Sequence, residues 1–302
     1  MMYNHQQFYY EGFLSVYMYG LEEALMNHIE EIETISFHSD EANTDKQLKE
    51  FLKGFIEMKF NHLPSQILQK TLILKHDELS LEKSCKAFEN IYIKHVYLQN
   101  EITEELKQRI KNSKKSVYTN PDLLVECTDG NSSAYFSIEV KSTKKDSIPG
   151  SSIQQINENE WVIFVKHTKH KIEITTGRYI NSINNILRFP DRSPRPEVSF
   201  NEMKRWNENY RKGNSDIICY TVNSDTIKEK QLLLEDWQNF LADKWIQILF
   251  QEDLKKNEPW FNVTLRKCAE KLIDKYDHFS LSEKESFKKR LRNSIKKKSK
   301  KN

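Results

Sequence analysis

The chain has 302 residues, of which 30% are charged and 11% aromatic, and its formal net charge is +3. This composition is typical of a folded globular protein and excludes an intrinsically disordered chain. No apolar run approaches the length that spans a bilayer, and the first residues lack the basic-then-apolar pattern of a secretory signal. The four cysteines show no CxxC spacing, which argues against a zinc cluster and favours reduced thiols. We therefore expect a cytoplasmic protein that does not associate with membranes.

Charge is distributed unevenly along the chain. Residues 1–53 hold ten acidic residues and three lysines, whereas residues 284–302 hold ten lysines or arginines and one acid. Such a distribution fits a protein that presents only some of its surfaces to a polyanion. A solvated helix end explains the basic tail equally well, and the sequence leaves both interpretations open.

Residues 8 to about 112 are expected to be mostly helical. Apolar residues recur at helical spacing in 21–29 and again in 48–55. A third helix is predicted over 80–98, with a serine as its N-cap, and a fourth near 101–111.

The segment 116–142 predicts a β-hairpin, because the turn-forming residues 128–133 lie between two runs of alternating apolar residues. With the tip at Gly130 and Asn131, Asp122 lies directly opposite Glu139. A tip one residue earlier makes the two acids diagonal neighbours on the same face.

The apolar pattern excludes a one-residue slip between these registers, because the slip would bury charges and expose the core. One face of the hairpin is apolar: Leu123, Val125, Cys127, Ala134, Phe136, Ile138 and Val140. The opposite face holds Asp122, Leu124, Glu126, Tyr135, Ser137, Glu139 and Lys141. Two acids and a lysine therefore share one face, where their burial is costly unless a metal or a substrate uses them.

A short helix is predicted to begin at Ser151, with Gln154 completing a capping box, and to end near Asn159. The apolar run 161–165 predicts a strand buried on both faces, and 172–176 predicts another. Strand, helix and strand in this order form a crossover unit that is normally right-handed.

Residues 188–213 are rich in arginine, proline and asparagine, and three prolines argue against a regular helix or a central strand at 190–196. A helix over 200–210 and a last strand over 217–222 are expected to follow. Residues 232–295 are expected to be helical. An apolar stripe there is interpreted as packing: Trp237, Phe240, Leu241, Trp245 and Leu249.

Pro121-Asp122, followed after sixteen residues by Glu139-Val140-Lys141, resembles the motif of the PD-(D/E)xK nuclease superfamily, and most closely that of type II restriction endonucleases. The resemblance implies an α/β fold with a restriction-endonuclease-like central mixed β-sheet flanked by helices. The catalytic core would be 113–225, between a mainly helical N-terminal region (1–112) and a helical C-terminal region with a basic tail (226–302). We expect these parts to form one compact domain.

The resemblance also implies a Mg²⁺-dependent endonuclease that hydrolyses double-stranded DNA at a specific sequence. Asp122 and Glu139 would be the metal ligands, and Lys141 would lie near the attacking water. Gln154 and Gln155 are both candidates for an assisting glutamine, and Gln155 is preferred because Gln154 is assigned to the capping box. Mg²⁺ suits this role because it binds few carboxylates together with waters and substrate phosphates. The exonuclease branch often has a tyrosine where this chain has Asn159, which argues against that branch.

Some relatives add an acid from a helix before the first strand, and spacing does not choose among Glu89, Glu101, Glu104 and Glu105. Lys144 and Lys145 form a basic run at the mouth of the predicted site. Further candidate DNA contacts are Arg188, Arg192, Arg195, Lys204, Arg205 and Asn207. Arginine reads guanine and asparagine reads adenine, although simple contact with phosphate or solvent is equally consistent with the pattern.

A restriction enzyme implies a homodimer if its target is palindromic, and a cognate DNA methyltransferase in the host. Two other functions remain open. One is a repair, recombination or transposition nuclease of the same fold, and the other is a non-catalytic DNA-binding module. An ordinary surface salt bridge of Glu139 is the simplest structural alternative.

Overall fold

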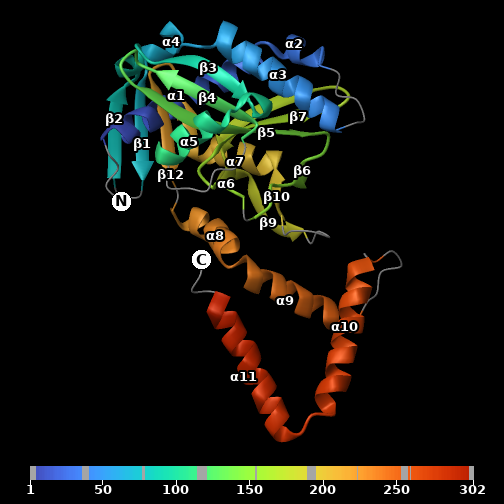
Figure 1. Ribbon diagram of the computed structural model, residues 1–302. Coiled ribbons are helices and arrows are strands. Elements are labelled where there is room, and N and C mark those ends of the chain that lie inside the picture. The colour runs from blue at the N-terminus through green and yellow to red at the C-terminus, as the bar shows by residue number, and fades with distance from the viewer. Residues whose placement is uncertain are drawn as a thin grey trace. The chain divides into compact units, whose positions relative to one another are not determined.

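The computed structural model divides the chain into two compact units, Met1–Glu235 and Asp236–Asn302 (Figure 1). The residues that the structure describes are 5–35, 41–76, 79–113, 121–153, 155–188, 195–222, 224–252, 258 and 260–298. Within these ranges no helix combines the length and apolar character required to cross a membrane.

A five-stranded mixed sheet forms the centre of the first unit. Its strands, in spatial order, are β3 (Tyr92–Leu98), β4 (Leu123–Thr128), β5 (Ser133–Thr143), β7 (Trp161–His167) and β8 (Ile172–Arg178). Neighbouring strands are antiparallel except β5 and β7, which are parallel. Strand β7 is buried along almost its whole length, as its continuous apolar run predicts.

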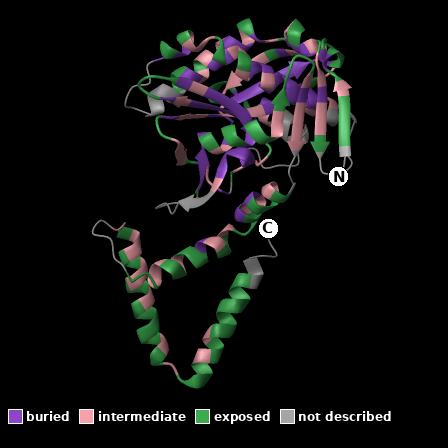
Figure 2. Cartoon of the chain, turned by 180° about the vertical axis from the view of Figure 1, so that it is seen from behind, coloured by how far each residue is buried: buried purple, intermediate pink, exposed green. Residues whose placement is uncertain are grey.

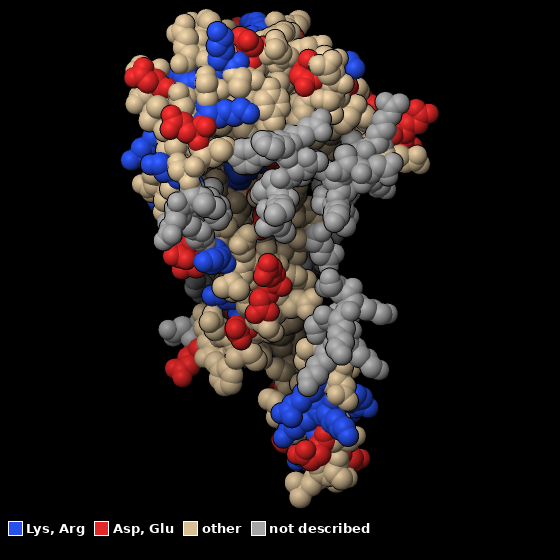
Figure 3. Space-filling model, turned by 90° about the vertical axis from the view of Figure 1, so that its left-hand side faces the viewer, with Lys and Arg blue, Asp and Glu red and all other residues tan. Residues whose placement is uncertain are grey.

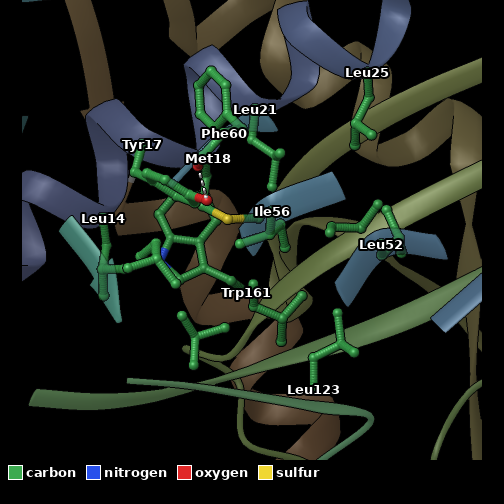
Figure 4. Packing of buried hydrophobic residues seen from close by; sticks show 14 of the residues in the cluster. Leu14, Tyr17, Met18, Leu21, Leu25, Leu52, Ile56, Phe60, Leu123 and Trp161 are labelled. Carbon is green, nitrogen blue, oxygen red and sulfur yellow. Dashed lines mark hydrogen bonds between the residues drawn. The ribbon is translucent and has the colours of Figure 1, made fainter. Parts of the chain in front are cut away.

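Helices cover both faces of this sheet. On one face lie α1 (His5–Met26) and α3 (Glu41–Lys59), whose apolar residues pack with Leu123 and Trp161 (Figure 4). This face is the main hydrophobic core, and it contains the apolar residues of the hairpin that the sequence pattern groups together.

The other face is covered by α5 (Glu104–Ser113) and α7 (Phe200–Tyr210). Leu124 packs with residues around α5 in a separate small cluster, and the rings of Phe164 and Phe200 lie 5.7 Å apart. The mixed α/β architecture, with a central sheet flanked by helices, is therefore confirmed.

Two smaller sheets complete the first unit. One has the order β11-β12-β1-β2 and the other the order β6-β10-β9. Their strands are β1 (Thr71–His76), β2 (Leu79–Ser84), β6 (Ser147–Pro149), β9 (Ile183–Arg188), β10 (Arg195–Ser199), β11 (Arg211–Gly213) and β12 (Ile217–Val222). The remaining helices of this unit are α2 (Ile29–Glu33), α4 (Ser65–Leu68), η1 (Cys85–Phe88), η2 (Gln99–Glu101), α6 (Tyr179–Ser182) and α8 (Ser224–Glu235).

The second unit consists of α9 (Trp237–Leu249), α10 (Trp260–Asp277) and α11 (Leu281–Lys298). Leu241 is its only buried residue within the described ranges, and α10 and α11 are mostly exposed (Figure 2). Trp245 of the predicted packing stripe contacts Phe261, with ring centroids 6.0 Å apart.

The helix predicted over 80–98 is wrong, because β2, η1 and β3 occupy this region. A register shift between Ile93 and His95 interrupts the pairing of β3 with β4. The extra residue places Ile93 and Val96, three positions apart, in the buried core. Buried residues three apart imitate helical periodicity, which explains the error. Strand β1 likewise makes the first 112 residues less helical than predicted.

The helix predicted from Ser151 to Asn159 is also wrong, because the described residues there form only isolated turns. Ser151 does not act as an N-cap. Its hydroxyl donates to Glu139 and its backbone N–H donates to the hydroxyl of Tyr179. Gln154, the predicted partner in the capping box, lies outside the described residues. The parallel crossover from β5 to β7 is present without a helix in its described part.

The argument that prolines exclude a central strand near 190–196 fails at Pro196, which lies in β10, the middle strand of its sheet. A register shift between Pro196 and Val198 interrupts the ladder there, and a bulge is a position where a missing N–H is tolerated. The helix predicted over 200–210 and the strand over 217–222 are confirmed as α7 and β12.

Candidate active site

The register of the hairpin brings the two predicted acids together. Leu123 pairs with Ile138 across β4 and β5, so Asp122, one residue before β4, lies opposite Glu139. Oδ2 of Asp122 accepts a hydrogen bond of 2.8 Å from the backbone N–H of Val140. The Asp122 carboxylate is therefore fixed beside the residue that follows Glu139.

A lysine that the sequence reading missed completes the surroundings of Asp122. The Nζ of Lys49, from α3, lies 2.7 Å from Oδ1 of Asp122, and the two side chains are 24% and 17% exposed. The only sequence signal for Lys49 is its position next to the buried Leu48, at the margin of the apolar stripe of α3. Nothing in that pattern indicates a partner 73 positions further along the chain.

Glu139 and Lys141 form a second, partly enclosed ion pair. Nζ of Lys141 lies 2.6 Å from Oε1 of Glu139, and each side chain is 15% exposed. The hydroxyl of Ser151 donates a further hydrogen bond of 3.0 Å to the same oxygen. Glu139 is thus held by one neighbour on its own strand and one from the loop that follows β6.

The electrostatic surroundings keep Lys141 charged. Burial lowers the pKa of Lys141, but the negative charge of Glu139, together with smaller contributions from Tyr179 and Asp122, outweighs burial and raises the pKa above its ordinary value. The ammonium group therefore remains protonated at neutral pH, where it can stabilise developing negative charge.

Tyr179 is a second residue that the sequence reading missed. It is buried, and burial raises its pKa. Its hydroxyl accepts the backbone N–H of Ser151 at 2.8 Å. A Cβ on the preceding residue, Gly150, would lie 2.5 Å from this hydroxyl and 2.6 Å from the carbonyl oxygen of Pro196. Only glycine therefore lets the loop approach closely enough for Ser151 to reach Glu139.

The site offers two carboxylates to a cation. Among the described residues, no group of three or more histidines, cysteines or acids is placed to share a metal. Mg²⁺ does not require such a group, because one or two carboxylates suffice when waters and substrate phosphates supply the other oxygens. Asp122 and Glu139 supply carboxylate oxygens of this kind.

None of the four candidate upstream acids joins these two in a described metal-binding group. Glu101 is bonded to Lys53, with an Nζ to Oε2 distance of 2.6 Å, and Glu104 to Lys107 at 2.6 Å. Glu89 and Glu105 are exposed.

Gln155, the predicted assisting residue, lies in a turn with an exposed side chain. Its backbone N–H donates to the carbonyl of Ser152 at 2.7 Å. In the described part of the chain, its side chain makes no hydrogen bond with Asp122, Glu139 or Lys141, so the structure does not bring it into the site.

The predicted basic contacts lie in several places. Lys144 and Lys145 are exposed just beyond the end of β5. Arg195 is exposed and pairs across the small sheet with Arg188, the last residue of β9. Arg192 lies outside the described residues.

The helix α7 presents two of its predicted contacts at the surface, and both are ion-paired. Lys204 lies 3.0 Å from Glu173, and Arg205 lies 3.0 Å from Glu202. Their side chains are 46% and 67% exposed, which leaves them accessible to an anion.

Asn207 is not available for reading a base. It is buried, and its amide nitrogen donates to Oγ1 of Thr175 and to the carbonyl of Thr176, both at 2.8 Å. The sequence does not reveal this burial, because a polar residue such as Asn207 is ordinarily expected at the surface. Only the contact with β8 explains why it is buried. Its role is to attach α7 to the sheet.

His167 and His170, whose spacing resembles a metal site only loosely, differ in environment. His167 is buried, with Nε2 3.1 Å from the hydroxyl of Ser142, whereas His170 is exposed. Neither belongs to a metal-binding group among the described residues.

Comparison of the chain with models of known protein families, with curated proteins and with solved structures found no match in any of the three.

Proposed function

We propose that the chain is a Mg²⁺-dependent endonuclease that hydrolyses phosphodiester bonds of double-stranded DNA at a specific sequence, as type II restriction enzymes do. One observation carries the proposal. Asp122 lies opposite Glu139 at the start of the β4–β5 pairing, and the charges of Glu139 and Asp122 both raise the pKa of Lys141. Each of the three side chains is less than one-fifth exposed. Removing charged side chains from water costs free energy. Clusters of such side chains are found preferentially at functional sites, where the chemistry requires them.

In this proposal Asp122 and Glu139 hold the metal ion. When bound, Mg²⁺ supplies a water of lowered pKa and neutralises charge on the phosphate. The ammonium group of Lys141 would donate a hydrogen bond to the attacked phosphate or orient the nucleophilic water. Ser151 and Tyr179 position Glu139, and Lys49 positions Asp122.

The architecture supports a restriction-endonuclease-like core. The antiparallel strands β3, β4 and β5 are followed by the parallel strand β7, with helices on both faces. Lys144, Lys145, Arg195, Lys204 and Arg205 are the exposed candidates for contact with DNA. A homodimer and a host methyltransferase follow from the same proposal, and the expected compartment is the cytoplasm.

The test uses Lys141→Ala, because Lys141 contributes to the reaction without being a proposed metal ligand. The variant should bind duplex DNA with an affinity close to that of the wild type and should cut it at least about 100-fold more slowly. The matched control is Lys166→Ala, a lysine on the adjacent β7 whose partner is Asp146 at 3.7 Å. Equal cutting by wild type and Lys141→Ala would remove Lys141 from the mechanism.

The same three residues also suit a repair or recombination nuclease, and the cleavage pattern separates the two. Discrete fragments from linear DNA support sequence recognition, whereas cutting confined to junctions or ends supports repair. Binding of DNA without any cleavage would support a non-catalytic module.

A further inference from the structure

Helix α11 carries a positive charge that the described chain does not neutralise. Between Leu281 and Lys298 it holds eight lysines or arginines and two glutamates. The basic residues whose side chains the structure describes are Lys284, Lys288, Lys289, Arg290 and Arg292. None of them forms an ion pair with an acid in the described residues, and basic side chains gather in a patch in the lower part of Figure 3.

Many lysines of the first unit differ in this respect. Lys53, Lys59 and Lys204, for example, each lie within 3.0 Å of a glutamate oxygen. On α11, by contrast, like charges follow one another at a spacing of four residues, as at Lys284, Lys288 and Arg292. Like charges at this spacing repel each other and destabilise a helix. A bound polyanion would offset the repulsion between these cations, because its negative charges attract each of them.

We propose that α11 binds the phosphate backbone of duplex DNA and so contributes affinity that does not depend on sequence. This inference rests on the proposed function, because it takes the substrate of the candidate site as the partner of α11. Phosphate contacts are the main source of sequence-independent affinity in DNA-binding proteins.

The distribution of charge around α11 favours DNA over a lipid surface. A helix that lies in a membrane interface keeps its cations on one face and an uninterrupted apolar face opposite. On α11 the apolar line Phe287, Leu291 and Ile295 is interrupted by Lys284 and Lys288, which fall on the same side of an ideal helix. Cations on all sides suit a helix in the major groove, which has phosphates along both edges.

The experiment compares two triple variants of the full chain that lose the same charge. In the test variant, Lys288→Gln, Lys289→Gln and Arg292→Gln remove unpaired charges from α11. In the control variant, Lys59→Gln, Lys171→Gln and Lys228→Gln remove charges that are paired with acids. Circular dichroism checks that both variants keep the helical content of the wild type.

The readout is the dissociation constant for a fluorescent duplex in EDTA at several salt concentrations. The test variant should bind at least about tenfold more weakly at low salt, and its salt slope should fall by about 2.7, since each phosphate contact contributes about 0.9. The control variant should stay within about twofold of the wild type, because its charges are already screened by partners.

Three results would overturn the inference: an unchanged slope in the test variant, equal losses in both variants, or binding of anionic phosphatidylglycerol vesicles in place of duplex DNA. The binding experiment on α11 can fail or succeed independently of the test for DNA cleavage. Wild-type protein that binds DNA through α11 but never cuts it with Mg²⁺ contradicts the nuclease and leaves the role of α11 intact. If the wild-type protein cuts DNA with Mg²⁺ and the α11 variant binds DNA as the wild type does, the nuclease proposal stands and the role of α11 is contradicted.

Discussion

The ammonium group of Lys49 lies 2.7 Å from the carboxylate of Asp122, which connects helix α3 to the start of β4. The second oxygen of the same carboxylate accepts the backbone N–H of Val140. Asp122 is therefore held by two donors from different elements, and its orientation is set before any ligand binds. Such preorganisation is what a metal ligand needs.

This pair should contribute measurably to stability, because both side chains are mostly enclosed. In a double-mutant cycle with Lys49→Met and Asp122→Asn, we expect a coupling of about 1–3 kcal/mol in the free energy of unfolding. Urea denaturation of the four proteins measures it. The exposed pair Lys228 and Asp225 is the control, with an expected coupling below about 1 kcal/mol. Similar couplings for the two pairs would contradict the enclosed geometry.

Gly150→Ala should destabilise the first unit and loosen Glu139. The added methyl group would meet the hydroxyl of Tyr179 and a backbone oxygen at distances that no real Cβ tolerates. We expect a loss of about 1–3 kcal/mol in the free energy of unfolding. Gly54→Ala in α3 is the control, because its Cβ would meet only the flexible end of Met58. The control should be neutral or stabilising by up to about 1 kcal/mol. A harmless Gly150→Ala would show that the loop does not need this close approach.

His167 should make the protein less stable in mild acid. Burial, and to a smaller degree the charge of Lys144, lowers the pKa of His167 in the folded protein. The unfolded chain binds this proton more readily, so the stabilising contribution is complete above a pH of about 6.5 and is lost as the pH falls through the folded-state pKa.

Replacement of this residue tests the sign directly. His167→Gln should reduce the loss of unfolding free energy between pH 8 and pH 5, as measured by urea denaturation at each pH. His170→Gln, at an exposed position, should leave that loss unchanged. A steeper loss in His167→Gln than in the wild type would mean that the folded protein favours the charged form.

The sequence predicts that Asp122 and Glu139 come together across the hairpin, because strand alternation is a strict constraint. Two registers bury the apolar residues of the hairpin, and both keep Asp122 and Glu139 on one face. The structure adopts the register that sets the two acids opposite each other. Contacts between residues far apart in the chain cannot be predicted from strand alternation. Lys49 reaches Asp122 only once α3 packs on the sheet, and Asn207 becomes buried only against β8.

The errors in secondary structure have a related cause. The bulge in β3 gives Ile93 and Val96 a helical spacing, although both belong to a strand. The helix expected at Ser151 fails because its hydroxyl bonds with Glu139 instead of capping a helix. In both places the sequence carries a local signal for a helix, but contacts with distant residues favour a different structure.

The Mg²⁺ concentration required for DNA cleavage should change when either proposed ligand, Asp122 or Glu139, loses its charge. Glu139→Gln should lower the cleavage rate at saturating Mg²⁺ by at least about 100-fold and raise the Mg²⁺ concentration needed for half-maximal cutting, because one metal ligand loses its charge. Titration of Mg²⁺ in a cleavage assay measures both effects. Asp225→Asn, an exposed acid outside the site, is the control and should match the wild type. An unchanged Mg²⁺ requirement in Glu139→Gln would exclude this residue as a ligand.

The most direct measurement is digestion of a plasmid of known sequence by the purified chain, with the fragment ends sequenced. We predict discrete fragments that share one sequence at their ends when Mg²⁺ is present, none when EDTA is present, and none with Asp122→Ala. Undiminished cutting by Asp122→Ala, or intact plasmid with the wild-type protein and Mg²⁺ across a panel of DNAs, would contradict the assignment of this site to DNA cleavage.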